Sequence, residues 1–244
     1  MRVKHLLTLL LIPVFLSSCL DGPATPEGAS QRAATATRIP KASPTPAPPL
    51  AFETVSENAY QDPVGSLRFL VEVGNANDHP VESVSATVVL RDEEGRTVAS
   101  QSAYARLDLL EAGDVAPVLV VFFLAHPDFA THDIEIDAQR ADYLAQLLHP
   151  ALEVVDLSGR IGEWVPYEVL GQVHNAGPLD AQSVTLSVTC YDANGKIVAI
   201  GTGRATDRVI PAHGSSDFLV AVGALAGDID KCRVRAEGLV PSGY

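Results

Sequence analysis

The chain has 244 residues, with 17 lysines and arginines against 30 aspartates and glutamates, so its formal net charge is −13. This charge argues against a nucleic-acid partner, which needs a basic face to meet its phosphates, and against electrostatic docking on anionic lipid. Hydrophobic residues make up 47% of the chain and charged residues 19%, which is enough apolar material for a core. The length allows one large domain or two domains of about 100 residues each.

The N-terminal residues have the pattern of a secretion signal. A basic start precedes an apolar stretch over residues 6–16, which is too short to span a bilayer. The stretch ends in Leu16, Ser17, Ser18 and Cys19, which resembles the bacterial lipobox of an apolar residue, two small residues and a cysteine. The resemblance implies cleavage before Cys19 and a diacylglyceryl thioether on its sulfur. The alternative is an ordinary signal peptide with an incidental cysteine.

Residues 1–18 are therefore predicted to be a lipoprotein signal peptide. Acyl chains stabilise membrane binding by about 0.8 kcal/mol per buried CH₂. The prediction is an extracytoplasmic protein held by Cys19 on the cell membrane, or on the outer membrane if the host has one. Residues 19–49 are rich in Pro, Thr and Ala and show no hydrophobic periodicity, so they are interpreted as an extended linker.

The rest of the chain repeats at an offset of one hundred residues. Over residues 70–112, thirteen positions are identical to their counterparts over residues 170–212. The period is far longer than the 20–50 residues of solenoid repeats, so each copy is predicted to be a whole domain. The predicted bounds are residues 50–138 and 152–244, with a connector over residues 139–151.

Apolar residues alternate with other residues along each copy, which predicts strands with one buried face. On the first such stretch, residues 67–73, Leu70 and Glu72 fall on the outward phase. Residues 92–95 and 192–195 are predicted hairpin turns, and the Asn-Gly pair in the second is typical of a type I′ turn. Short strands with a turn about every ten residues indicate an all-β antiparallel sandwich. The other predicted elements are strands over residues 84–90, 184–190, 115–124, 133–138, 216–223 and 231–236, strands containing Val98 and Val198, and one or two helical turns within residues 141–149.

Two stretches of the second copy resemble a known family. Val-His-Asn-Ala-Gly at residues 173–177 and Val-Thr-Cys-Tyr-Asp at residues 188–192 are similar to the FxLYD domain, a small Ig-like sandwich of bacterial and archaeal envelope proteins. The first copy has Val-Val-Leu-Arg-Asp at residues 88–92. The resemblance implies two tandem Ig-like sandwiches outside the cytoplasm, and it brings no catalytic residues.

Nothing in the sequence predicts catalysis. It contains no Gly-x-Ser-x-Gly, no glycine-rich phosphate loop before a helix, and no His or Cys at metal-ligand spacing. The prediction is therefore a protein that is not an enzyme, with no catalytic residue, no metal and no cofactor. His126 and His132, which flank Asp128 and Asp133, are expected to be solvated loop residues, with a metal site as the alternative.

Two non-catalytic functions remain open. The first is a binding, assembly or scaffold module that works with an envelope protein partner. The second is a ligand- or cation-binding component that uses the acidic segment over residues 126–142. In that segment Asp133, Glu135 and Asp137 alternate with isoleucines, which predicts carboxylates on one exposed strand face.

Three side chains have both a structural and a functional interpretation. Asn75 and Asn175 each end a predicted strand and are expected to bond the loop backbone rather than a ligand. Trp164 is expected to lie in the core or to cover a sheet edge, with a binding platform as the alternative. Val64 stands at the corresponding position of the first copy.

Cys190 and Cys232 are the cysteines left after lipidation, an even count in an oxidising compartment. Both lie on the inward phase of their strands, and their predicted counterparts in the first copy are Leu90 and, with a shifted alignment, Ile134. This pattern favours a disulfide, which requires Cα atoms within about 7 Å. Two separate buried thiols are the alternative, because cysteine packs like a small hydrophobe.

Overall fold

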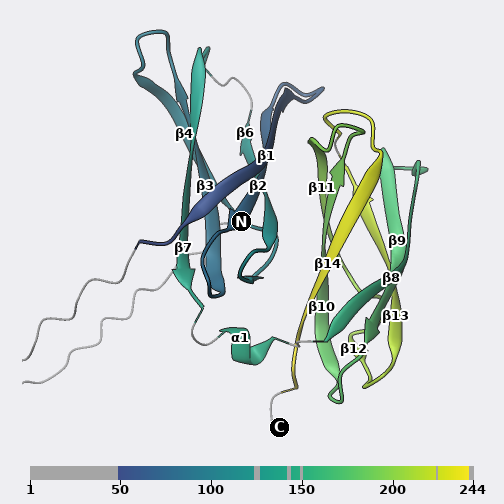
Figure 1. Cartoon of the computed structure of the whole chain (residues 1–244). Helices are drawn as coiled ribbons and strands as arrows, with labels where there is room; N and C mark the ends of the chain where they lie inside the picture. The colour runs from purple at the N-terminus through teal and green to yellow at the C-terminus, as the bar shows by residue number, and fades with distance from the viewer. Residues whose placement is uncertain (1–48, 124–126, 142–143, 149–150, 224, 242–244) are drawn as a thin grey trace, which may run out of the picture. The chain divides into compact units, whose positions relative to one another are not determined.

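The computed structural model describes residues 49–123, 127–141, 144–148, 151–223 and 225–241. The predicted signal peptide, Cys19 and nearly all of the predicted linker lie outside these residues, as do His126 and His149. Within the described residues the chain is built of antiparallel strands with one helical turn, α1 (Leu144–Leu147), which confirms the predicted all-β class (Figure 1). None of the described helical residues forms a helix with the length and hydropathy needed to cross a bilayer.

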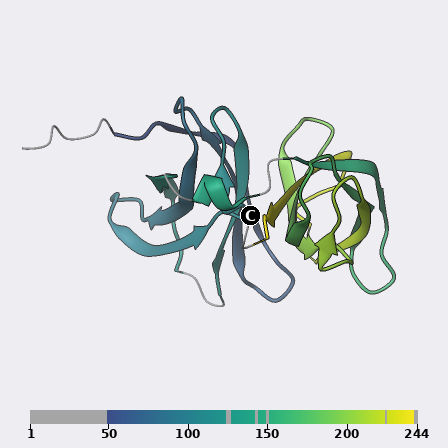
Figure 2. The ribbon, with the colours of Figure 1, turned by 90° about the horizontal axis from the view of Figure 1, so that it is seen from below.

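The first half of the described residues forms two sheets that face each other. One sheet has the strand order β1-β2-β6; in the other, β3 pairs with β4, β5 and β7. Figure 2 shows the strands of this half nearly end-on, as two layers. The strands are β1 (Phe52–Gln61), β2 (Leu67–Asn75), β3 (Val81–Arg91), β4 (Thr97–Tyr104), β5 (Leu109–Leu110), β6 (Val115–Phe122) and β7 (Thr131–Arg140).

The second half repeats this topology strand for strand. One sheet has the order β13-β9-β8, and in the other β10 pairs with β11, β12 and β14. We call the halves the first and second sandwich. The strands are β8 (Leu152–Arg160), β9 (Tyr167–Asn175), β10 (Ala181–Tyr191), β11 (Ile197–Arg204), β12 (Val209–Ile210), β13 (Ser215–Val222) and β14 (Lys231–Leu239).

Each sandwich has its own apolar core. Phe69, Val71 and Val73 of β2 are fully buried in the first core, as the alternation predicts. In the second core Val188 and Cys190 of β10 are equally buried. Apolar side chains therefore fill the space between the two sheets of each sandwich.

The turn between β10 and β11 differs from the predicted type I′. The Gly195 amide donates to the Asp192 carbonyl at 3.0 Å, and Gly195 has φ 80°, but Asn194 is not among the described residues with positive φ. This is a type I turn followed by a left-handed glycine, and it shifts the β10–β11 register by one residue. The cause is the Asp192 side chain, whose Oδ1 accepts the Asn194 and Lys196 amides at 2.9 and 2.8 Å.

Asn75 and Asn175 occupy equivalent structural positions, and both are buried. The Asn75 amide donates to the carbonyls of His79 and Leu110, both at 3.0 Å, while its Oδ1 accepts the Asn77 amide. Asn175 makes the same set of bonds in the second sandwich. As expected, these side chains bond the backbone of two neighbouring loops at this end of each sandwich.

Candidate functional site

The face of β2 that points away from the first core is also buried. Leu70 and Glu72 lie on this outward phase, yet their residue exposures are only 2% and 3%. Leu70 packs in a third apolar cluster with Tyr191 and Ile197 of the second sandwich. The described residues of both sandwiches accordingly belong to one compact unit. We call this contact between the sandwiches the junction.

A buried carboxylate lies in the junction. Oε1 of Glu72 accepts a hydrogen bond from the Tyr191 hydroxyl and a second from Nη2 of Arg233 at 2.7 Å. The Glu72 side chain is 4% exposed and the Arg233 side chain 38%. Burial, and next the Glu72 carboxylate itself, raises the pKa of Tyr191, so the hydroxyl stays protonated and remains a donor. A charge this deep is tolerated because both partners compensate its lost hydration.

Tyr191 and Arg233 each directly follow a cysteine. Cys190 and Cys232 are register partners on β10 and β14, and the structure joins them with Cα atoms 4.0 Å apart. This meets the predicted distance condition. Because side chains alternate along a strand, the cysteines face the second core while Tyr191 and Arg233 face Glu72. The disulfide therefore fixes the spacing of β10 and β14, the two strands whose Tyr191 and Arg233 side chains bind the Glu72 carboxylate.

The first sandwich shows the same register at the corresponding strands. Leu90 pairs with His132, so the counterpart of Cys232 is His132 at the unshifted offset, and the predicted Ile134 is wrong. His132 is also not the solvated loop residue that the sequence suggested. Its ring lies edge-on to Phe69 with centroids 4.9 Å apart, and its Nε2 is 3.4 Å from Oε1 of Glu57. The longer strand β7 is the reason, because it takes residue 132 out of the preceding loop.

A second carboxylate crosses the junction farther along β14. Glu237 accepts the backbone amides of Asp108 at 2.7 Å and Leu109 at 3.1 Å. Nearby, Nη1 of Arg235 lies 2.6 Å from Oδ2 of Asp114. Arg233, Arg235 and Glu237 of β14 thus all contact the first sandwich, because every second residue of a strand points to the same face.

Glu237→Gln tests the charge in this contact, because the amide keeps an acceptor oxygen. Burial raises the pKa of Glu237 above its ordinary value of 4.5, although the two backbone amides oppose the shift. A group whose pKa is higher in the folded than in the unfolded protein stabilises the fold at pH values below its unfolded-state pKa. This contribution to the free energy of unfolding is lost as the pH rises through its folded-state pKa. We therefore expect the difference in free energy of unfolding between the wild type and E237Q, measured by urea titration, to decrease as the pH is raised from 4 to 7. A difference that rises over this range would contradict the argument.

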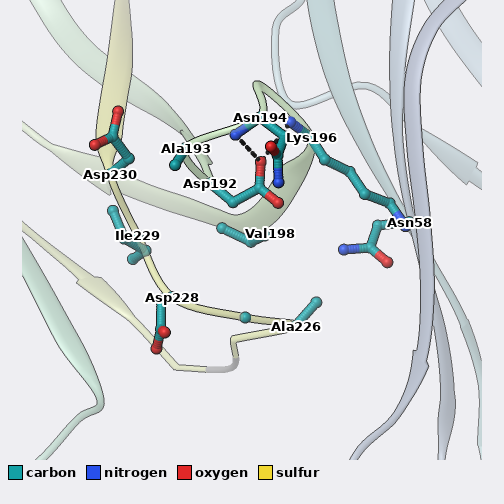
Figure 3. A pocket seen from close by; sticks show the side chains of 11 residues that line it. Asn58, Asp192, Ala193, Asn194, Lys196, Val198, Ala226, Asp228, Ile229 and Asp230 are labelled. Atoms are coloured by element: carbon teal, nitrogen blue, oxygen red, sulfur yellow. Dashed lines mark hydrogen bonds between the residues drawn. The ribbon is translucent and has the colours of Figure 1, made fainter.

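A groove of about 580 Å³ opens beside the junction (Figure 3). Asn58 of β1 lines one side, and the Lys196 side chain extends toward it. Asp228 and Asp230 lie on the other side, and their carboxylates point in different directions from that of Asp192. The Asp192 carboxylate accepts backbone amides of its own turn, which lowers its pKa. The arrangement is a polar groove whose carboxylates do not converge on one point.

The predicted carboxylate strip lies on β7. Asp133, Glu135 and Asp137 are exposed, while Ile134 and Ile136 between them are half-buried. Asp133 accepts a hydrogen bond from Nε of Arg91 at 2.5 Å, so it is already paired. Across the described residues no group of three or more His, Cys, Asp or Glu side chains is placed to hold a metal ion.

Trp164 does not lie in the core or over a sheet edge, as the sequence suggested. It is 88% exposed on the loop between β8 and β9, and Ile161 on the same loop is 85% exposed. Val64 at the corresponding place in the first sandwich is 70% exposed. The loop extends past the ends of its two strands, where neither sheet has a surface to receive a side chain.

The sequence analysis missed the residues of the junction. A comparison of the outward-facing strand residues of the two copies could have found them. Where the second copy has Tyr191, Ile197 and Ile200, the first has Arg91, Thr97 and Ser100. Where the second has Arg233, the first has Asp133. When only one of the two copies has apolar side chains on an outward face, this difference indicates that another part of the protein covers that face.

The chain matches no protein-family model and no curated protein. It has a distant likeness to the crystal structure of red sea bream transglutaminase, with 8% sequence identity and a TM-score of 0.26. The match covers 76% of this chain and 29% of that protein, so the chain spans less than a third of the transglutaminase's length. A TM-score this low carries no argument about fold or activity.

Proposed function

We propose that the chain is a membrane-anchored extracytoplasmic lipoprotein whose two Ig-like sandwiches form a non-catalytic binding or assembly module. The observation that carries the proposal is Cys19, preceded by two serines and a leucine at the end of an apolar stretch. A basic start, a short apolar stretch and small residues before the cleavage point are typical of a secretion signal. Acylation of Cys19 would hold the module on a membrane.

The linker and the junction support this role. Residues 19–49 contain repeated prolines, and such segments are extended and semi-rigid, so they would hold the module away from the lipid. The junction joins both sandwiches into one unit through an apolar cluster and the Glu72 contacts. A rigid scaffold that presents loops is suited to recognition, because binding then costs less ordering of the chain.

Cys19→Ser tests the anchor. The variant should lose metabolic labelling with radioactive palmitate and leave the membrane fraction, or stay uncleaved, because serine has no thiol to alkylate. Ser18→Ala is the matched control, since it keeps a small side chain at the neighbouring position and should still be labelled. A mature-sized, lipid-labelled Cys19→Ser protein in the membrane fraction would disprove the proposed anchor.

A further inference from the structure

Large apolar side chains are exposed at one end of the sandwiches. Within the described residues, the large apolar and aromatic residues that are at least 70% exposed are Val64, Tyr104, Phe123, Ile161 and Trp164. Val64, Ile161 and Trp164 lie in the β1–β2 and β8–β9 turns, and Phe123 directly follows β6, at the end that pairs with Leu67. Single exposed apolar residues are common on protein surfaces, but several together mark an interaction site.

The strand registers define this end. The turn between β1 and β2, residues 62–66, lies a whole strand length from Phe52, where the chain enters the first sandwich. The β8–β9 hairpin repeats this, with its turn at residues 161–166. Tyr60, beside the first turn, and Ile197, beside the β10–β11 turn, share one apolar cluster, so the turn ends of both sandwiches lie on the same side (Figure 1). We call this side the distal end; its apolar tips are Val64, Ile161 and Trp164.

The distal end carries several exposed carboxylates. Glu163 is exposed on the same loop as Trp164, and Asp228 and Asp230 are exposed on the loop before β14. Glu93 and Glu94 are exposed in the β3–β4 turn. The arginines at this end are ion-paired with carboxylates; these pairs are Arg68–Asp62, Arg91–Asp133, Arg96–Asp92, Arg96–Glu94 and Arg160–Glu168. Lys196 and Lys231 are also exposed at this end, so the exposed carboxylates outnumber the lysines there.

We infer that the distal end docks a protein partner that receives Ile161 and Trp164 in an apolar pocket with a basic rim. The inference rests on the proposed function and names the surface by which the module acts. Protein interfaces combine buried aromatic anchors with a charged rim, and tryptophan is enriched among their strongest contacts. An anionic membrane would be repelled by the carboxylates of the distal end, whereas a basic protein rim is attracted by them. The distal end also lies a whole strand length from Phe52, the first residue of β1.

Site-specific photo-crosslinking in the native host tests this surface. A benzophenone amino acid at position 161 of the full chain should give one discrete protein adduct, and the same residue at position 104, the matched exposed control, should give none. Trp164→Ala in the position-161 protein should lower the adduct yield at least about tenfold, since losing about 1.4 kcal/mol of an anchor contact weakens binding by that factor. Glu163→Lys with Asp228→Lys should lower it as well. Palmitate labelling of the same cells reports anchoring separately, so loss of the adduct with intact labelling overturns only the docking surface.

Other results would overturn the inference. These are no protein adduct at position 161, equal adducts at both positions, or a yield that Trp164→Ala leaves unchanged. A membrane partner is tested with the purified chain, because Trp164 is its single tryptophan. Its emission should not shift to shorter wavelength when vesicles of phosphatidylcholine and phosphatidylglycerol are added to the non-acylated Cys19→Ser protein. A blue shift there, with quenching by brominated lipid, would mean that the tips enter lipid rather than a protein pocket.

Discussion

Replacing both Cys190 and Cys232 by alanine is expected to lower the free energy of unfolding of the second sandwich by up to about 4 kcal/mol. The two cysteines are 42 residues apart, and their bond closes that loop in the unfolded chain, which reduces the unfolded chain's entropy. Such a loss is large beside the roughly 5–15 kcal/mol that stabilises a typical domain. Urea unfolding measures the total, and hydrogen exchange resolved by peptide assigns the loss to one sandwich.

Reduction of the wild-type protein should reproduce this loss and leave the two-alanine variant unchanged. The first sandwich has no cysteine, so exchange of its core amides should respond far less. Thiol counting on the denatured, unreduced mature protein decides whether the bond is formed. Two reactive thiols at residues 190 and 232 would contradict it.

Arg233→Ala is expected to lower the free energy of unfolding by about 3 kcal/mol. The substitution leaves the Glu72 carboxylate, 4% exposed, with the Tyr191 hydroxyl as its remaining hydrogen-bond donor among the described side chains. Removing one partner of a buried pair costs about 3–5 kcal/mol, and the value should lie at the lower end because Arg233 is 38% exposed. Calorimetry should also show the two sandwiches melting farther apart, since the contact that couples them is weakened.

The repeat supplies a matched control for this prediction. Asp133 is the counterpart of Arg233, and its partner Arg91 is the counterpart of Tyr191, but the two side chains are 55% and 32% exposed. Asp133→Ala should therefore cost under about 1 kcal/mol, the usual value of an exposed pair. Adding Glu72→Gln to Arg233→Ala should restore most of the loss, because it removes the uncompensated charge. Equal losses for Arg233→Ala and Asp133→Ala, or no recovery in the double variant, would show that burial of Glu72 does not stabilise the junction.

Local patterns in the sequence were enough to predict most strands and the inward side chains. Alternation over residues 67–73 predicted that Phe69 and Val71 are buried, because neighbouring side chains on a strand point to opposite faces. The strands β1 and β8 were missed, since exposed residues dominate both. The turn type at Asn194 was also missed, because the Asp192 side chain rather than the Asn-Gly pair determines the backbone there.

The sequence by itself determined the all-β class, the repeat and the phase of each cysteine, because these depend on residues close together in the chain or on a fixed offset. It also placed Leu70 and Glu72 on the outward phase correctly. Whether an outward face meets water or another sheet is a different question, and only the tertiary structure decided it. Glu72 is buried because Tyr191, 119 residues away, and Arg233, 161 residues away, complement it in shape and charge. A strand period of two describes which side a residue faces, but it carries no information about which distant surface covers that side.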